Sequence, residues 1–154
     1  MSAPAPMSAL SLVLADDHAI VRMGFRLLLE GVGALVLAEA DSGETAQQLM
    51  QELDPDVLVM DLSMPGCGGL AALERILARK PGQKVLIASA HADAITAERA
   101  LKVGAAGYLC KRSPPDELLK AVGLVAAGQR YIDPEIAAAL RRADRPEHPA
   151  EALT

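Results

Sequence analysis

Short apolar runs alternate with longer segments of helical periodicity along most of the chain. The runs cover residues 10–15, 34–40, 57–60, 85–88 and 107–109. They are too short for helices, and their alternation with helical segments is typical of a parallel sheet with helices on its faces. Near-continuous hydrophobicity, as in Val57-Leu58-Val59-Met60, favours strands buried on both faces. We therefore predict an α/β fold with a doubly wound, five-stranded parallel sheet in a three-layer sandwich.

The segments between these runs carry helix signals. The first has apolar residues at helical spacing, followed by two glycines that can end it. These apolar residues are Ile20, Val21, Phe25, Leu28 and Leu29, and the glycines are Gly31 and Gly33. Further helices are predicted to begin near Ser42, Gly69 and Asp93.

The fifth predicted helix has the most complete start signal. Ser113 can cap it, Pro114 fits its first turn, and Asp116 and Glu117 lie near its positive end. It should run to about Ala127.

Four segments follow from these patterns. Residues 1–8 are expected to be a disordered N-terminal tail and residues 9–129 the domain itself. Asp133-Pro134-Glu135 repeats the helix-start signal, so residues 130–142 should hold a short extra helix. Residues 143–154 resemble a polar linker.

Composition and charge exclude several functions. The chain has 154 residues, a length that fits one domain, and its apolar residues are aliphatic, with one Phe, two Tyr and no Trp. This disfavours an aromatic platform for single-stranded nucleic acid. The chain has a net charge of -5, whereas DNA-binding domains carry a basic surface, so we expect no direct contact with DNA.

The two cysteines and the chain start give weaker signals. Cys67 and Cys110 lack the spacing of a zinc site, and we expect buried free thiols rather than a disulfide or a redox pair. The N-terminus lacks the basic start and apolar core of a signal peptide. Since no apolar stretch approaches the roughly 20 residues that cross a bilayer, we expect a cytoplasmic protein without membrane contact.

Acidic residues follow two of the predicted strands. Asp16 and Asp17 come after the first strand and Asp61 after the third. Because the carboxyl ends of neighbouring parallel strands form the ligand crevice of an open sheet, these carboxylates are expected to meet there. A hard divalent cation such as Mg²⁺ would relieve their mutual repulsion.

Two further strand ends supply complementary groups. Ser89 follows the fourth strand and Lys111 the fifth, which adds a hydroxyl and a fixed cation to the same edge. A carboxylate nucleophile flanked by Mg²⁺ and an ammonium group can accept a phosphoryl group, since this transfer depends on positioning and charge neutralisation. Taken alone, a residue of these types at a strand end more often caps a helix or faces solvent. Their joint placement favours a phosphorylation site.

Three segments carry a family resemblance. Residues 12–18 (LVLADDH), 61–66 (DLSMPG) and 104–111 (GAAGYLCK) are similar to the opening, the phosphorylation loop and the closing strand of response regulator receiver domains, closest to the NarL/LuxR subfamily. The resemblance spans about residues 8–129 and implies the flavodoxin-like receiver fold. Ser89 replaces the commoner Thr, and Cys110 replaces a larger aliphatic residue.

The resemblance also implies roles. Asp61 would be the phosphoacceptor, and Asp16, Asp17, Asp61 and the backbone carbonyl of Ser63 would bind Mg²⁺. Ser89 and Lys111 would assist the transfer, and Ser89 and Tyr108 would form the switch. A sensor histidine kinase would donate the phosphoryl group, and a homodimer would form on phosphorylation. Transcription would be controlled through a helix-turn-helix domain beyond this chain, with no catalysis except self-phosphorylation and autodephosphorylation.

Three other functions have some support in the sequence. Gly66-x-Gly68-x-x-Ala71 formally fits a relaxed dinucleotide-binding pattern, but it follows the third strand and no acidic residue ends the next one. A phosphatase with an Asp nucleophile would need an acid two residues later, where this chain has Ser63. A stand-alone receiver, or an interaction module that is never phosphorylated, stays open as the alternative.

Overall fold

A single parallel sheet forms the centre of the molecule in the computed structural model, which describes residues 6–64, 68–90 and 93–143. The strand order is β2-β1-β3-β4-β5-β6, and every neighbouring pair is parallel. The strands are β1 (Ser11–Ala15), β2 (Leu35–Ala40), β3 (Val57–Met60), β4 (Val85–Ser89), β5 (Gly107–Cys110) and β6 (Tyr131–Ile132). The helices are α1 (Ala19–Gly31), α2 (Gly43–Glu52), α3 (Gly69–Arg79), α4 (Ala94–Val103), α5 (Pro115–Ala126) and α6 (Pro134–Ala143). The predicted doubly wound α/β fold is confirmed.

The predicted number of five strands is wrong, because β6 adds a sixth at the edge of the sheet. It pairs with β5 through Gly107 opposite Tyr131 and Tyr108 opposite Ile132. A two-residue strand gives no apolar run, so its sequence carries no strand signal. The segment predicted as an extra helix therefore holds both a strand and a helix.

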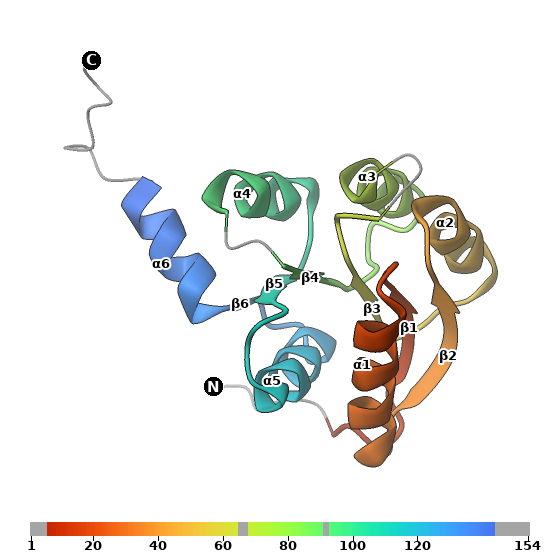
Figure 1. The fold of residues 1–154 in the computed structure, drawn as a ribbon. Coiled ribbons are helices and arrows are strands. Elements are labelled where there is room, and N and C mark those ends of the chain that lie inside the picture. Colours follow the sequence, from red (N-terminus) through yellow and green to blue (C-terminus); the bar gives the residue numbers. More distant parts are fainter. Residues whose placement is uncertain (1–5, 65–67, 91–92, 144–154) are drawn as a thin grey trace.

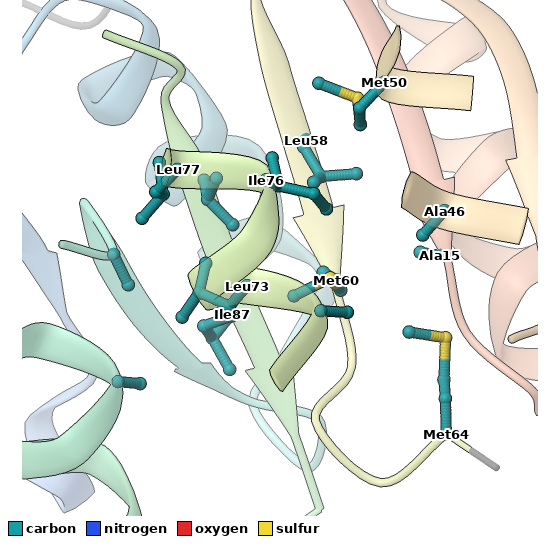
Figure 2. Close-up of a cluster of buried hydrophobic side chains, with 14 of the residues drawn as sticks. Ala15, Ala46, Met50, Leu58, Met60, Met64, Leu73, Ile76, Leu77 and Ile87 are labelled. Carbon is teal, nitrogen blue, oxygen red and sulfur yellow. The ribbon is translucent and has the colours of Figure 1, made fainter. Parts of the chain in front are cut away.

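Helices cover the sheet on both faces, as Figure 1 shows. Alternate strand residues point to opposite faces, so each strand contributes to two core layers. Val13, Leu58 and Ile87 join the layer under α2, α3 and α4, which also takes Ile136 of α6. Figure 2 shows much of this layer, with α3 residues Leu73, Ile76 and Leu77 among its labelled side chains. The other layer packs against α1 and α5 and holds alternate residues of the same strands.

Several predicted helix starts are confirmed. Ser42 caps α2 by accepting a hydrogen bond from the Thr45 amide at 3.2 Å, and Asp93 caps α4 by accepting one from the Ile95 amide at 3.1 Å. These side chains satisfy amides that a helix start leaves without an intrahelical partner. Helix α3 begins at Gly69, as predicted.

One local prediction is wrong. Ser113 does not cap α5, because its hydroxyl donates to Asp133 instead, and the cap position falls on Pro114. Ile20 lies in α1, as its spacing predicts, and is 84% exposed. It precedes Phe25 by five positions, which rotates it by about 140° from that side chain on an α-helix.

The structure describes only part of the predicted N-terminal tail and of the predicted linker. Met7 packs against the core layer under α1 and α5, and residues 1–5 of the predicted tail lie outside the described residues. The predicted linker lies there too from residue 144 onward. Among the helices that the structure describes, none is both long and apolar enough to span a bilayer.

Gly69 allows α3 to start directly on the backbone of Leu62. A Cβ at Gly69 would lie 2.3 Å from the Leu62 Cα, closer than two non-bonded carbon atoms can approach. We expect Gly69→Ala to lower the free energy of unfolding by about 3 kcal/mol, because the backbone beside Asp61 must shift. Chemical denaturation measures this.

The matched control is Gly24→Ala, in the middle of α1. A Cβ there meets no atom within 4 Å, and alanine favours a helix by about 0.5–1 kcal/mol over glycine. Equal stability of the two variants would contradict the close approach at Gly69.

Candidate functional site

Two buried carboxylates lie side by side at the ends of β1 and β3. The parallel register puts Ala15 opposite Met60, so the next residues, Asp16 and Asp61, leave the sheet together. The Asp61 amide donates to the Ala15 carbonyl at 2.9 Å and fixes this arrangement. Asp16 is 4% and Asp61 1% exposed. The prediction that distant acids meet at one rim is confirmed.

Lys111 bridges the two carboxylates. Its Nζ lies 2.7 Å from Asp16 Oδ2 and 3.0 Å from Asp61 Oδ2, and its side chain is 8% exposed. The lysine reaches the site because its amide donates to the Ser89 carbonyl at 2.8 Å, which extends the β4–β5 pairing by one residue. Carboxylates without such a cation would be strongly destabilising when buried.

The second oxygen of each carboxylate also has a partner. Asp61 Oδ1 accepts from the Ser63 amide at 3.1 Å, and Asp16 Oδ1 accepts from the His18 amide at 2.8 Å. Asp17 is the most open of the three acids, with 32% of its side chain exposed. One oxygen of the nucleophile candidate is thus held by an amide and the other by an ammonium group.

His18 belongs to the site, although sequence analysis assigned it no role. Its Nδ1 lies 3.0 Å from Asp16, 3.2 Å from Asp17 and 3.8 Å from Asp61 carboxylate oxygens. It is also 3.3 Å from Lys111 Nζ. The only sequence signal for this residue was its position directly after the acidic pair.

The donor atoms fit a divalent cation. Asp16, Asp17, His18 and Asp61 each offer one ligand atom, and all these atoms lie within 4.8 Å of one another. Carboxylate oxygens dominate the set, which is the donor chemistry that Mg²⁺ favours. The backbone contact of Ser63 runs through its amide, and a metal-binding role for its carbonyl stays a prediction.

The hydroxyl and the aromatic residue of the predicted switch are both buried. Ser89 is the last residue of β4 and 1% exposed, and Tyr108 of β5 is completely buried. The Tyr108 hydroxyl finds no partner of good hydrogen-bond geometry among the described residues. Burial raises the pKa of Tyr108, with Asp93 and Asp61 adding to the effect and the nearby Ser89 side chain opposing it.

The predicted free thiols are confirmed for Cys110, which is buried and unpaired. Cys67 and Gly66 lie outside the described residues, so the glycine pattern is visible only from Gly68 onward. Gly68 has a φ of 89°, which glycine adopts without strain, and Gly69 opens α3. These glycines shape the turn after Asp61.

Comparisons with known proteins agree on one family. Residues 12–123 match the family described as the response regulator receiver domain. Response regulator GacA of Pseudomonas aeruginosa is 40% identical over 129 residues, which cover 83% of this chain and 60% of GacA. The chain thus spans about three fifths of the length of the curated relatives it matches.

Solved structures give the same picture. A LuxR-family response regulator from Aurantimonas sp. SI85-9A1 superimposes with a TM-score of 0.85 at 39% identity, covering 88% of this chain and 98% of that one. RcsB from Salmonella enterica serovar Typhimurium, bound to promoter P1flhDC with the phosphomimetic BeF₃⁻, gives 0.80 at 25% identity, covering 86% and 67%. The subfamily resemblance found in the sequence is confirmed.

The two tyrosines of the chain allow an optical test of the buried site. Burial raises the pKa of Tyr131 as well, and its hydrogen bond to Glu117 adds to the effect. At about pH 10, the ordinary pKa of tyrosine, we expect the folded protein to show less tyrosinate absorption than the denatured protein. The pKa values of Tyr108 and Tyr131 are higher in the folded than in the unfolded protein. Their burial should therefore contribute fully to the free energy of unfolding below this pH, and the contribution should fall above it.

A spectrophotometric pH titration with and without denaturant measures both effects. Tyr131→Phe leaves Tyr108 as the only chromophore of this kind, since the chain has two Tyr and no Trp. Half-ionisation of the folded Tyr131→Phe protein at the pH where the denatured protein titrates would show that Tyr108 is not buried.

Proposed function

Because the chain belongs to the response regulator receiver domain family, we propose that it accepts a phosphoryl group on Asp61 from a sensor histidine kinase. The observation that carries the proposal is that Lys111 bridges the Asp61 and Asp16 carboxylates at the carboxyl edge of the sheet. Asp61 is deeply buried, but its cluster of ligand atoms also includes Asp17, which is exposed to solvent. A phosphoryl group can therefore approach from the Asp17 side.

The transfer forms one bond and breaks another. An Asp61 oxygen attacks phosphorus, the bond from phosphorus to the donor's histidine nitrogen breaks, and that nitrogen keeps the electron pair. Asp61 Oδ2 is the oxygen that faces the Lys111 ammonium, which is placed to neutralise charge on the moving phosphoryl oxygens. The Ser63 amide holds Oδ1 and orients the carboxylate. Water later hydrolyses the acyl phosphate, which resets the site.

Asp16, Asp17, Asp61 and the Ser63 carbonyl are the groups that would hold Mg²⁺. When bound, the ion supplies positive charge to the phosphoryl oxygens. The acidic residues also keep anionic donors from approaching the metal-free site, since like charges repel. Binding of the cation and of the donor should therefore be linked.

The switch requires two states with different affinities for the phosphoryl group. The Ser89 hydroxyl and Lys111 are the groups that would contact it, and both already lie at the end of β4 and β5. Tyr108 is buried beside Ser89, so this structure has the aromatic ring in its inward position. Phosphorylation would favour this inward state over an outward one.

Partners beyond the kinase follow from the longer relatives. We infer that residues 9–129 act as the receiver and that residues 143–154 lead to a DNA-binding domain, as the relative bound to a promoter suggests. The phosphorylated form is proposed to dimerise in the cytoplasm. Leu118, Val122 and Val125 of α5 are core residues, so the dimer surface must use other side chains.

A stand-alone or unphosphorylated interaction module is the alternative. Such a module has no physical need for two buried carboxylates, because their burial costs stability unless Lys111 compensates it. The cluster around Asp61 therefore favours the phosphoacceptor.

Replacement of the acceptor tests the proposal directly. With Mg²⁺ and acetyl phosphate, the wild-type protein should gain one phosphoryl group by intact mass spectrometry, and hydroxylamine should remove it. Asp61→Asn should gain none, because an amide oxygen is a poor nucleophile. The control is Asp41→Asn, an exposed carboxylate after β2 at the same edge of the sheet. Labelling of Asp61→Asn at the wild-type rate would refute the assignment.

A phosphoryl mimic tests the switch separately. Beryllofluoride should change the NMR signals of the Tyr108 ring and the Ser89 amide, because the mimic would draw Ser89 and Lys111 toward Asp61. The internal control is the Asp56 amide, which donates to the Ser11 carbonyl where β1 and β3 begin and should change little. Bound beryllofluoride with unchanged Tyr108 signals would rule out its role as a switch.

A further inference from the structure

Asp133 is a buried carboxylate that the proposed phosphorylation site does not use. It lies between β6 and α6 and is 2% exposed. The family match ends at residue 123, so this side chain belongs to the segment that follows the matched region. A carboxylate this deeply buried must be compensated by hydrogen bonds.

The Asp133 carboxylate joins two parts of the chain. Its Oδ1 accepts from the Glu135 amide at 2.9 Å, and the Asp133 carbonyl accepts the first helical hydrogen bond of α6 from Ala137. Its Oδ2 accepts from the Cys110 amide at 3.2 Å and from the Ser113 hydroxyl. One oxygen thus caps α6 and the other holds the loop after β5.

That loop carries Lys111. Cys110 precedes the lysine directly and Ser113 follows it by two residues, so Asp133 Oδ2 accepts from a backbone amide before Lys111 and from a side-chain hydroxyl after it. On its other side, the same lysine bridges Asp16 and Asp61. An additional contact, from Arg112 to Glu135 at 2.9 Å, ties the loop to the first turn of α6.

Helix α6 also reaches the layer that contains the switch. Ile136 is completely buried and belongs to the same core cluster as Tyr108, and α6 contacts both α4 and β5. Figure 1 shows α6 continuing from β6 at the edge of the sheet, toward the end of the described chain. A change in the Lys111 loop can therefore pass to α6 directly through Asp133, beside the contact of Arg112 with Glu135.

We propose that Asp133 is a positioning residue for Lys111, and that it couples the phosphorylation state of Asp61 to the docking of α6. This inference rests on the proposed function, since it assumes that Lys111 contacts the phosphoryl group. By thermodynamic linkage, a phosphoryl group that fixes Lys111 stabilises the α6 cap, and a docked α6 raises the affinity of the site for the phosphoryl group.

Asp133→Asn separates the two halves of this connection. Asparagine caps helices as well as aspartate does, so its oxygen can keep the bond to the Glu135 amide. Its NH₂ group then faces the Cys110 amide, and two donors cannot form a hydrogen bond. The variant should loosen the Lys111 loop while α6 keeps its cap. Ser113→Ala is a milder second variant that removes one donor and introduces no clash.

The control is Asp56→Asn. Asp56 Oδ2 accepts from the Ser11 amide at 2.8 Å and from the Ser11 hydroxyl at 3.1 Å, the same pair of donor types. It lies where β1 and β3 begin, at the edge of the sheet away from Lys111, and it is exposed. Asp56→Asn makes the same chemical change as Asp133→Asn. The control therefore shows the effect of disturbing such a pair of hydrogen bonds far from Lys111.

Two binding constants distinguish positioning from general destabilisation. Beryllofluoride affinity, measured by NMR titration of the whole chain with Mg²⁺ present, should fall about tenfold in Asp133→Asn and about threefold in Ser113→Ala. Mg²⁺ affinity without the mimic should stay equal or rise, because a loosened Lys111 competes less for Asp16 and Asp61. Asp56→Asn should match the wild type in both.

Hydrogen exchange gives the reciprocal measurement. Beryllofluoride should slow exchange at the Glu135 and Ala137 amides of the wild type, and it should fail to do so in Asp133→Asn. Wild-type beryllofluoride affinity in Asp133→Asn, or a parallel loss of both affinities, would overturn the inference. If that variant does not fold, wild-type affinity in Ser113→Ala would overturn it.

Failure of the underlying function looks different. A wild-type protein that binds no beryllofluoride would count against Asp61 as the acceptor. The connection itself would still be seen as faster exchange of the Cys110 amide in Asp133→Asn than in the wild type.

Discussion

The site depends on one electrostatic constraint, which is that carboxylates from β1 and β3 share a buried rim with a single lysine. The parallel register of β1 and β3 places Ala15 opposite Met60 and so brings the next residues, Asp16 and Asp61, together. Lys111 makes this arrangement tolerable, since its ammonium group contacts both acids. An added cation or anion would therefore change how strongly Lys111 binds each carboxylate.

The strand order explains why the acids meet at this rim. Strands β1 and β3 are neighbours at the point where the chain reverses its direction of winding, and the crevice outside their carboxyl ends is the general ligand position of such sheets. Gly69 contributes by letting α3 start on the backbone of Leu62, next to Asp61. The fold thus places Asp61, the proposed acceptor, directly after β3, while Ser89 ends β4 and Lys111 follows β5.

Sequence reasoning recovered the sheet and most of the site because both depend on local signals. Apolar runs mark the buried strands, and polar residues directly after them mark the rim, which was enough to place Asp16, Asp61 and Lys111 together. It missed what depends on tertiary contacts. The two residues of β6 have no pattern of their own, and their pairing with Gly107 appears only once β5 is in place.

The errors at individual side chains have the same origin. Ser113 has the residue type and position of a helix cap, but a buried acid from a later segment takes its hydroxyl. His18 follows the acidic pair, yet nothing in the sequence shows that its ring turns toward the carboxylates rather than toward solvent.

The connection through Asp133 extends this constraint beyond the rim. Lys111 faces the acids on one side, and its loop is held by the start of α6 on the other. The start of α6 is thus attached to the loop of the lysine that bridges Asp16 and Asp61. In an open sheet of this type, such a link is a short physical route from the crevice to the end of the chain.

Paramagnetic relaxation by Mn²⁺, used as a substitute for Mg²⁺, tests the central claim most directly. If the acids of β1 and β3 form one cation site beside Lys111, substoichiometric Mn²⁺ should broaden the amide signals of Asp17, Leu62 and Lys111 together, and excess Mg²⁺ should restore them. Broadening confined to one of these three segments, or broadening that Mg²⁺ does not reverse, would contradict the account.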